Sequence, residues 1–121
     1  MSTKKFTVMF YGVGKDPEVQ EWPDGDLETM QICVNGFIEC IQHPIKDLVI
    51  VMNEEGKLNA DPPNRHLYRG EKIIDTIVGD FFVCRQHRDD LVSLTDADIR
   101  LLYLEHNSPD LIKRLMGLVA I

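Results

Sequence analysis

The chain has 121 residues and a formal net charge of −7, with 44% hydrophobic and 27% charged residues. This length predicts a single domain, residues 1–121, whose core can be stable without disulfides. The acidic charge argues against direct binding to nucleic acid or to a membrane surface, since both need a basic field, and no apolar run is long enough to span a bilayer.

The N-terminal third predicts a β-hairpin followed by a helix. The stretch 6–11, FTVMFY, is β-branched and aromatic, and PEVQEW at 17–22 alternates, so both are expected to be strands. D-G-D then opens a helix that N-G closes, with Leu27, Met30 and Val34 at the spacing of one apolar face.

The middle of the chain predicts more strands around one long loop. Strands are expected at 37–42 and 48–52, and the loop 53–69 follows, with a return strand starting at its K-L dipeptide. The segment 72–84 alternates and is expected to be one strand, with its internal glycine as a bulge or a site of close approach. A short strand is expected at 91–94.

The last third predicts two helices. T-D-A-D resembles a capping box, and the helix after it carries apolar residues on two faces. S-P then begins a second helix. The chain is therefore expected to be α+β, with a mixed or antiparallel sheet of about five to six strands, one helix after the N-terminal hairpin and two C-terminal helices.

Residues 99–121 contain more apolar positions than one helix face buries, which predicts a homo-oligomer interface. The alternative is that both helices cover the sheet and hide these side chains. The expected interface residues are Leu111, Leu115, Met116, Leu118 and Ile121.

Two C-x-x-H pairs raise the question of a metal site. Cys40 with His43 and Cys84 with His87 supply zinc-type ligands. In a strand, however, positions i and i+3 point to opposite faces, and cysteine is commonly a core residue. We therefore expect core cysteines and loop histidines, with no metal and no cofactor.

Catalytic signatures are also lacking. No local motif marks an activated thiol, and the adjacent Glu54 and Glu55 diverge rather than pair as acid and base. We expect a non-enzymatic protein, with a hydrolase or metal enzyme as the alternative. The odd number of cysteines and the short apolar patch near the N-terminus predict a cytoplasmic location.

The loop 53–69 is the predicted ligand site. Its prolines stiffen it, its amides suit a base edge or ribose, and its cations suit phosphate. The alternative is that the amides cap turns and that Arg65 pairs with Glu54 or Asp61. The expected ligand-binding residues are Asn53, Lys57, Asn59, Asn64, Arg65, Tyr68 and Arg69.

The order of these segments resembles a family of small proteins of phages, plasmids and other mobile elements, catalogued as a domain of unknown function, thirty-eight forty-six in that series. The resemblance covers about residues 6–102 and is sharpest at N-E-E-G-K-L (53–58) and P-x-N-R (62–65). Residues 103–121 then form a C-terminal helical extension. The resemblance brings no established chemistry, but its context suggests counter-defence.

Two functions are expected on these grounds. The first is a binding protein that sequesters a small anionic ligand, a nucleotide-derived signal, in a pocket around the loop 53–69. The second is an acidic protein that inhibits a host defence protein, with mimicry of nucleic acid as one way to do so. A net charge of −7 attracts the protein electrostatically to basic partners.

Overall fold

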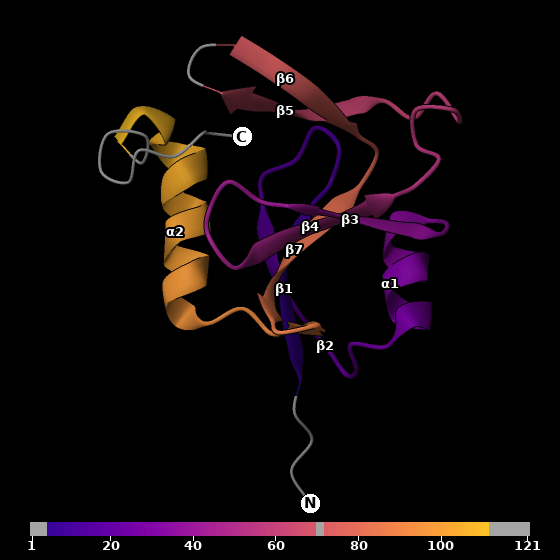
Figure 1. Ribbon diagram of the computed structural model, residues 1–121, viewed down its shortest axis with the longest axis vertical. Coiled ribbons are helices and arrows are strands. Elements are labelled where there is room, and N and C mark those ends of the chain that lie inside the picture. Colours follow the sequence, from indigo (N-terminus) through magenta and orange to yellow (C-terminus); the bar gives the residue numbers. More distant parts are fainter. Residues whose placement is uncertain (1–4, 70–71, 112–121) are drawn as a thin grey trace, which may run out of the picture.

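The computed structural model describes residues 5–69 and 72–111 of the chain. Its strands form a main antiparallel sheet in the order β2-β1-β7-β4-β3, with β8 paired to β7, and a separate antiparallel hairpin of β5 and β6 (Figure 1). The main-sheet strands are β1 (Phe6–Tyr11), β2 (Glu18–Trp22), β3 (Ile38–Gln42), β4 (Leu48–Asn53), β7 (Phe81–His87) and β8 (Asp90–Val92). The hairpin consists of β5 (Pro63–Arg69) and β6 (Lys72–Val78), and the helices are α1 (Leu27–Val34) and α2 (Asp96–Asn107).

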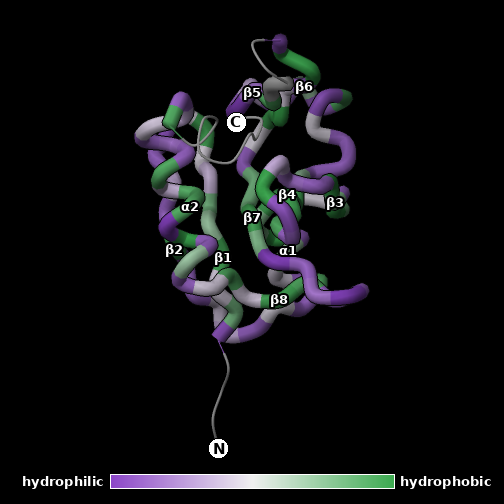
Figure 2. Tube along the Cα trace, turned by 60° about the vertical axis from the view of Figure 1, so that its left-hand side comes forward, coloured by the Kyte–Doolittle hydropathy of each residue, from purple (hydrophilic) through white to green (hydrophobic). Residues whose placement is uncertain are grey.

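The main sheet has a hydrophobic cluster on each face. On one face, Val8 and Val51 pack with Met30 and Val34 of α1. Because side chains alternate across a strand, their neighbours point to the opposite face, where α2 and the β5–β6 hairpin cover them. That second cluster includes Met9, Tyr11, Leu48, Ile50, Leu67, Ile77, Phe81, Val83 and Leu102. Figure 2 shows the central strands as hydrophobic and the connecting turns as mostly hydrophilic.

Both helices begin and end as the sequence predicts. The Asp26 side chain accepts a hydrogen bond from the backbone N–H of Thr29, and Asn35 ends α1 in the left-handed region with φ of 60°. At α2, Thr95 and Asp98 form a reciprocal capping box. Among the described helices, none is long and apolar enough to cross a membrane.

The predicted α+β class is confirmed, and the sheet is antiparallel. The hairpin at 6–22, the strands near 37–42 and 48–52, and the first C-terminal helix are confirmed. Residues 109–111 are helical again after Ser108, where the second C-terminal helix was expected, and the remainder of that helix lies outside the described residues.

The prediction of one strand across 72–84 is wrong. The strand is interrupted at Gly79, which has φ of +72°. As a result, β6 pairs with β5 in the hairpin, and β7 lies in the centre of the main sheet. A glycine adopts this conformation without the steric cost that other residues meet. Both strands have the same period of two, so alternation alone does not reveal the break.

The predicted return strand at Lys57 and Leu58 is also wrong. Residues 54–60 form consecutive turns, closed by hydrogen bonds such as that from the backbone N–H of Asn59 to the carbonyl of Glu55. The strand begins only at Pro63, whose lack of an N–H is tolerated at a strand start. Leu27, placed on the buried face of α1 by its spacing, is 55% exposed because it is the first residue of that helix.

Candidate functional site

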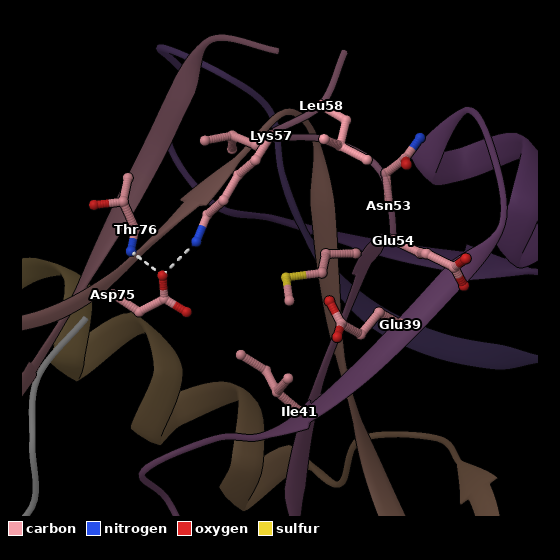
Figure 3. Close-up of a pocket in the computed structure, with 10 residues that line it drawn as sticks. Glu39, Ile41, Asn53, Glu54, Lys57, Leu58, Asp75 and Thr76 are labelled. Carbon is pink, nitrogen blue, oxygen red and sulfur yellow. Dashed lines mark hydrogen bonds and ion pairs between the residues drawn. The ribbon is translucent and has the colours of Figure 1, made fainter. Parts of the chain in front are cut away.

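The loop 53–69 borders a cavity of about 270 Å³ between the main sheet and the β5–β6 hairpin. One wall comes from β3 and β4, the other from β6, and the turns after β4 form its rim (Figure 3). The lining residues are Glu39, Ile41, Met52, Asn53, Glu54, Lys57, Leu58, Asp75, Thr76 and Val78.

Acidic groups outnumber basic ones in this cavity. Three carboxylates, those of Glu39, Glu54 and Asp75, line it beside one ammonium group, that of Lys57. The Lys57 Nζ atom lies 2.6 Å from Asp75 Oδ1. The hydrogen bond from Lys57 is the main cause that lowers the pKa of Asp75. The charges of Lys57 and Asp75 compensate each other. The carboxylates of Glu39 and Glu54 therefore give the cavity a net negative charge.

The cavity has an apolar side as well. Ile41 from β3 and Met52 from β4 line it, and both pack against the buried cluster under the hairpin. Leu58 stands at the rim and is 86% exposed. Figure 3 shows Ile41 and Glu39 projecting from the same strand into the space opposite Asp75. The arrangement suits a group with a cationic end and an apolar stem.

Asn53, a predicted ligand residue, fixes local structure. Its Nδ2 atom donates to the carbonyl oxygens of Val34 at 3.1 Å and Asn35 at 3.0 Å, at the end of α1. Its Oδ1 atom accepts a hydrogen bond from the backbone N–H of Glu55 at 2.7 Å. Asn53 therefore ties the start of the turns to α1 and turns its amide away from the cavity centre (Figure 3).

Asn64 and Arg65 lie elsewhere and brace the fold. The Asn64 amide donates to the carbonyl oxygens of Tyr11 and Gly79, at 2.9 and 2.8 Å. The Arg65 guanidinium donates to Asn64 and to the carbonyl oxygen of Lys15, and it lies 5.5 Å from the Tyr11 ring centre. The ion pairs of Arg65 with Glu54 or Asp61, which belonged to the alternative interpretation of the loop, are not among its contacts in the described residues.

The other predicted ligand residues are split. Lys57 lines the cavity, and Asn59 is exposed in the turns next to it. The backbones of Tyr68 and Arg69 belong to β5, and their side chains lie outside the described part of the structure. The structure thus brings Asn53 and Lys57 together at one cavity and places Asn64 and Arg65 at the β1–β2 turn.

The sheet separates the buried cysteine of one C-x-x-H pair from the buried histidine of the other. Cys84 is buried in the α1 cluster, whereas His43 is buried on the α2 side, with Nε2 3.4 Å from Oε1 of Glu105. Cys40 and His87 are exposed. Within residues 5–69 and 72–111, no three His, Cys, Asp or Glu side chains are grouped to hold a metal ion.

The cysteine environments disfavour nucleophilic chemistry. Burial raises the pKa of Cys33 and of Cys84 to about 12, and it also raises the pKa of Cys40. A thiol attacks as its thiolate, so raised pKa values make these side chains poor nucleophiles at neutral pH.

Of the predicted interface residues, Leu111 lies in the helical turn 109–111 and is half-buried. Leu115, Met116, Leu118 and Ile121 lie outside the described residues.

The sequence reasoning missed Glu39 and Asp75, the acidic residues of the two cavity walls. Each had a signal, since each is the only carboxylate in a stretch rich in apolar residues, in FIECI and KIIDTI. A charge at such a position implies a wet or paired environment. It also missed the buried contact of His43 with Glu105, because these residues are far apart in sequence and meet only when α2 packs on the sheet.

Comparison with protein-family models gives a match to the family described as Domain of unknown function (DUF3846), over residues 6–108. Neither the curated proteins nor the solved structures gave a match. The matched region spans every described strand and both α1 and α2, including the cavity. The chain therefore belongs to the DUF3846 family of domains of unknown function.

Proposed function

We propose that this protein is a non-enzymatic accessory protein that acts by binding a basic segment of another protein through the cavity between β3 and β6. The observation that carries the proposal is the chemistry of the cavity, where Glu39 and Glu54 leave negative charge beside the apolar Ile41 and Met52. A lysine or arginine side chain has the matching form, an apolar stem with a cationic head. The net charge of −7 adds long-range attraction for such a partner.

The context of the proposal is counter-defence by a phage or another mobile element. In that setting the partner is a basic host defence protein in the cytoplasm, and contact alone blocks it. Support for a non-enzymatic role comes from the raised pKa values of the cysteines and from the intramolecular partners of Asn53, Asn64 and Arg65.

A second candidate is sequestration of a small anionic, nucleotide-derived ligand. One observation favours it: Lys57 is well exposed and lines the same cavity as Asn53. The two candidates predict opposite charge effects. Neutralising Glu39 is expected to weaken the binding of a basic partner and to strengthen the binding of an anionic ligand. Neutralising Lys57 is expected to have the reverse effect on both.

Site-specific photo-crosslinking in bacterial cells tests the first candidate. A photoreactive residue replaces Leu58 at the cavity rim, and a matched protein carries it at Ile32 of α1, which is also exposed, at 73%. The proposal predicts a protein adduct from position 58 that disappears when Glu39 and Glu54 are changed to glutamine. Equal adducts from both positions, or an adduct that survives the glutamine changes, contradict it.

A further inference from the structure

The main sheet ends at β3, and the backbone of this strand has an unpaired side. Within the described residues, β3 pairs only with β4 and is the last strand in the order β2-β1-β7-β4-β3. Figure 2 shows β3 at the outer side of the sheet, next to β4. An edge strand of this kind offers a row of hydrogen-bonding groups to another extended chain.

The hydrogen-bond pattern shows which groups face outward. The backbone N–H of Glu54 donates to the carbonyl of Phe37, and that of His43 donates to the carbonyl of Leu48. The register between these two bonds has no shift. Hydrogen-bonded positions recur at every second residue of an antiparallel ladder. Ile38, Cys40 and Gln42 therefore turn their N–H and C=O groups away from β4.

The β3 edge lacks several of the usual protections against strand pairing, although it carries one charged residue, Glu39. Its sequence, IECIQ, contains no lysine and no proline, and its pairing with β4 contains no bulge. The opposite edge, β2, differs, because it lies between Pro17 and Pro23 and carries two exposed glutamates. The large apolar side chain of Phe37, just before β3, is 67% exposed.

The same strand forms a wall of the acidic cavity. Glu39 and Ile41 point from β3 into the cavity, beside Asp75 of the opposite wall (Figure 3). Residues side by side on paired strands share a face of the sheet. A chain paired to β3 thus places alternate side chains next to Glu39 and Ile41, where positive charge is complementary. Its other side chains lie beside Ile38 and Cys40, on the α1 face of the sheet.

We propose that β3 binds its partner by strand addition, in which an extended basic segment of another protein pairs antiparallel to or parallel with β3 and extends the main sheet. The segment alternates lysine or arginine, which face the acidic cavity, with small apolar residues on the other face. Main-chain hydrogen bonds to Ile38, Cys40 and Gln42 supply affinity, and the cavity supplies selection for basic side chains. This inference rests on the proposed function and adds the binding mode.

Amide hydrogen exchange resolved by residue tests the binding mode. The probe is the peptide acetyl-Lys-Val-Lys-Thr-Lys-Val-Lys-amide, and the control has the same side chains with its alternate backbone nitrogens methylated on the pairing edge. Exchange at Ile38, Cys40 and Gln42 is expected to slow by about tenfold or more with the probe and not with the control. Exchange at Gln20 on β2 stays unchanged.

Two variants of one position separate pairing from side-chain effects. Cys40→Pro removes an outward N–H that makes no bond to β4, and Cys40→Val keeps it. Probe binding is expected to weaken about tenfold in the first and to be retained in the second. Thermal unfolding of both variants checks that the fold persists; for a destabilised Cys40→Pro, the exchange pattern of the native protein decides.

The outcomes distinguish this inference from the function on which it rests. One outcome is that the probe and its methylated control bind with equal affinity and that Glu39→Gln weakens the binding of both. That result overturns strand addition but is consistent with the acidic cavity as the binding site of a basic segment. No binding of either peptide at millimolar concentration overturns both. Slow exchange at Ile38, Cys40 and Gln42 in the protein alone, increasing with its concentration, assigns the edge to a second copy and overturns the proposal.

Discussion

Asn53 and Val34 connect the end of β4 to the end of α1: the Asn53 amide donates to the Val34 carbonyl at 3.1 Å and to the carbonyl of Asn35 at 3.0 Å. The Asn53 side chain also lies close to the backbone of Gly36, the second residue after α1: a Cβ atom added to Gly36 would lie 2.5 Å from Asn53 Nδ2. The last carbonyl groups of a helix lack partners within it. Asn53 supplies those partners, so one side chain fixes both α1 and the turns that border the cavity.

Asn53→Ala is expected to lower the free energy of unfolding by about 1–3 kcal/mol, since it leaves the part-buried carbonyl of Val34 without its donor. Urea denaturation measures the change. Asn59→Ala is the matched control, because Asn59 is an exposed asparagine in the same turns and contributes a backbone bond that alanine keeps. Equal effects of the two substitutions would contradict this bracing role of Asn53.

Arg65→Ala is expected to destabilise the fold by about 1–3 kcal/mol, because its charged donors hold the Lys15 and Asn64 carbonyls. Thermal and urea unfolding measure this loss. Arg100→Ala, which removes an exposed arginine from α2, serves as the control and is expected to change stability little. A variant at Arg65 with unchanged stability and lost ligand binding would instead favour the anionic-ligand candidate.

The His43–Glu105 contact is expected to couple α2 to the β3–β4 turn. The backbone N–H of Ile45 donates to His43 Nδ1, so the ring proton lies on Nε2, facing Glu105. Both side chains are almost fully buried. Glu105→Ala is expected to lower the free energy of unfolding by about 1–3 kcal/mol, because it leaves the buried Nε2–H group of His43 without its partner.

The double variant His43→Phe with Glu105→Leu checks the coupling, since it removes both polar partners and fills similar volume. In a double-mutant cycle, its loss of stability is expected to be smaller than the sum of the losses caused by His43→Phe alone and by Glu105→Leu alone. Strictly additive effects would mean that the two residues do not act as a pair.

The Arg85–Asp98 bridge predicts a pH dependence. Burial raises the pKa of the Asp98 carboxyl, but hydrogen bonds from Arg85 and Thr95 outweigh it and hold the pKa below its usual value. A depressed folded-state pKa stabilises the protein above the unfolded value of about 4, and this stabilisation disappears as pH falls through the folded-state pKa.

Asp98→Asn is therefore expected to destabilise the protein at neutral pH and by nearly the same amount at pH values just above about 4. Below that, the difference between wild type and variant shrinks, because the wild type loses its charge-dependent bonds. Denaturant unfolding of both proteins across this range measures it. A difference that stays constant down to strongly acidic pH would contradict the assignment.

The sequence predicted the features that depend on residues close together in the chain, and it did not predict those that depend on distant residues. The caps at Asp26 and Thr95 and the strand β1 are local features, and the structure agrees. The break at Gly79 was not predicted, because the register of each flanking strand depends on its distant partners. The cavity depends on β3 lying opposite β6, so local sequence patterns could not predict that Glu39 and Asp75 line the same cavity.

The predicted ligand loop illustrates the same limit. Its amides were expected to read a ligand, with capping of turns as the alternative. Asn53 and Asn64 have backbone partners in α1, β1 and the Gly79 turn. Composition indicates that amides will make hydrogen bonds, and only the fold decides whether the partner is the protein itself.

Selection of basic partners by the acidic cavity is tested by calorimetric titration of a heptalysine peptide into three proteins at low and moderate salt. The first is the wild type, and the second carries Glu39→Gln with Glu54→Gln. The third carries Glu28→Gln with Asp89→Asn, which removes the same charge from exposed sites that do not line the cavity.

The cavity variant is expected to bind heptalysine at least about tenfold more weakly than the wild type, while the third protein retains most of the wild-type affinity. Added salt weakens wild-type binding and reduces the difference between proteins. Equal loss in the two variants would show that only net charge matters and would contradict a selective acidic cavity.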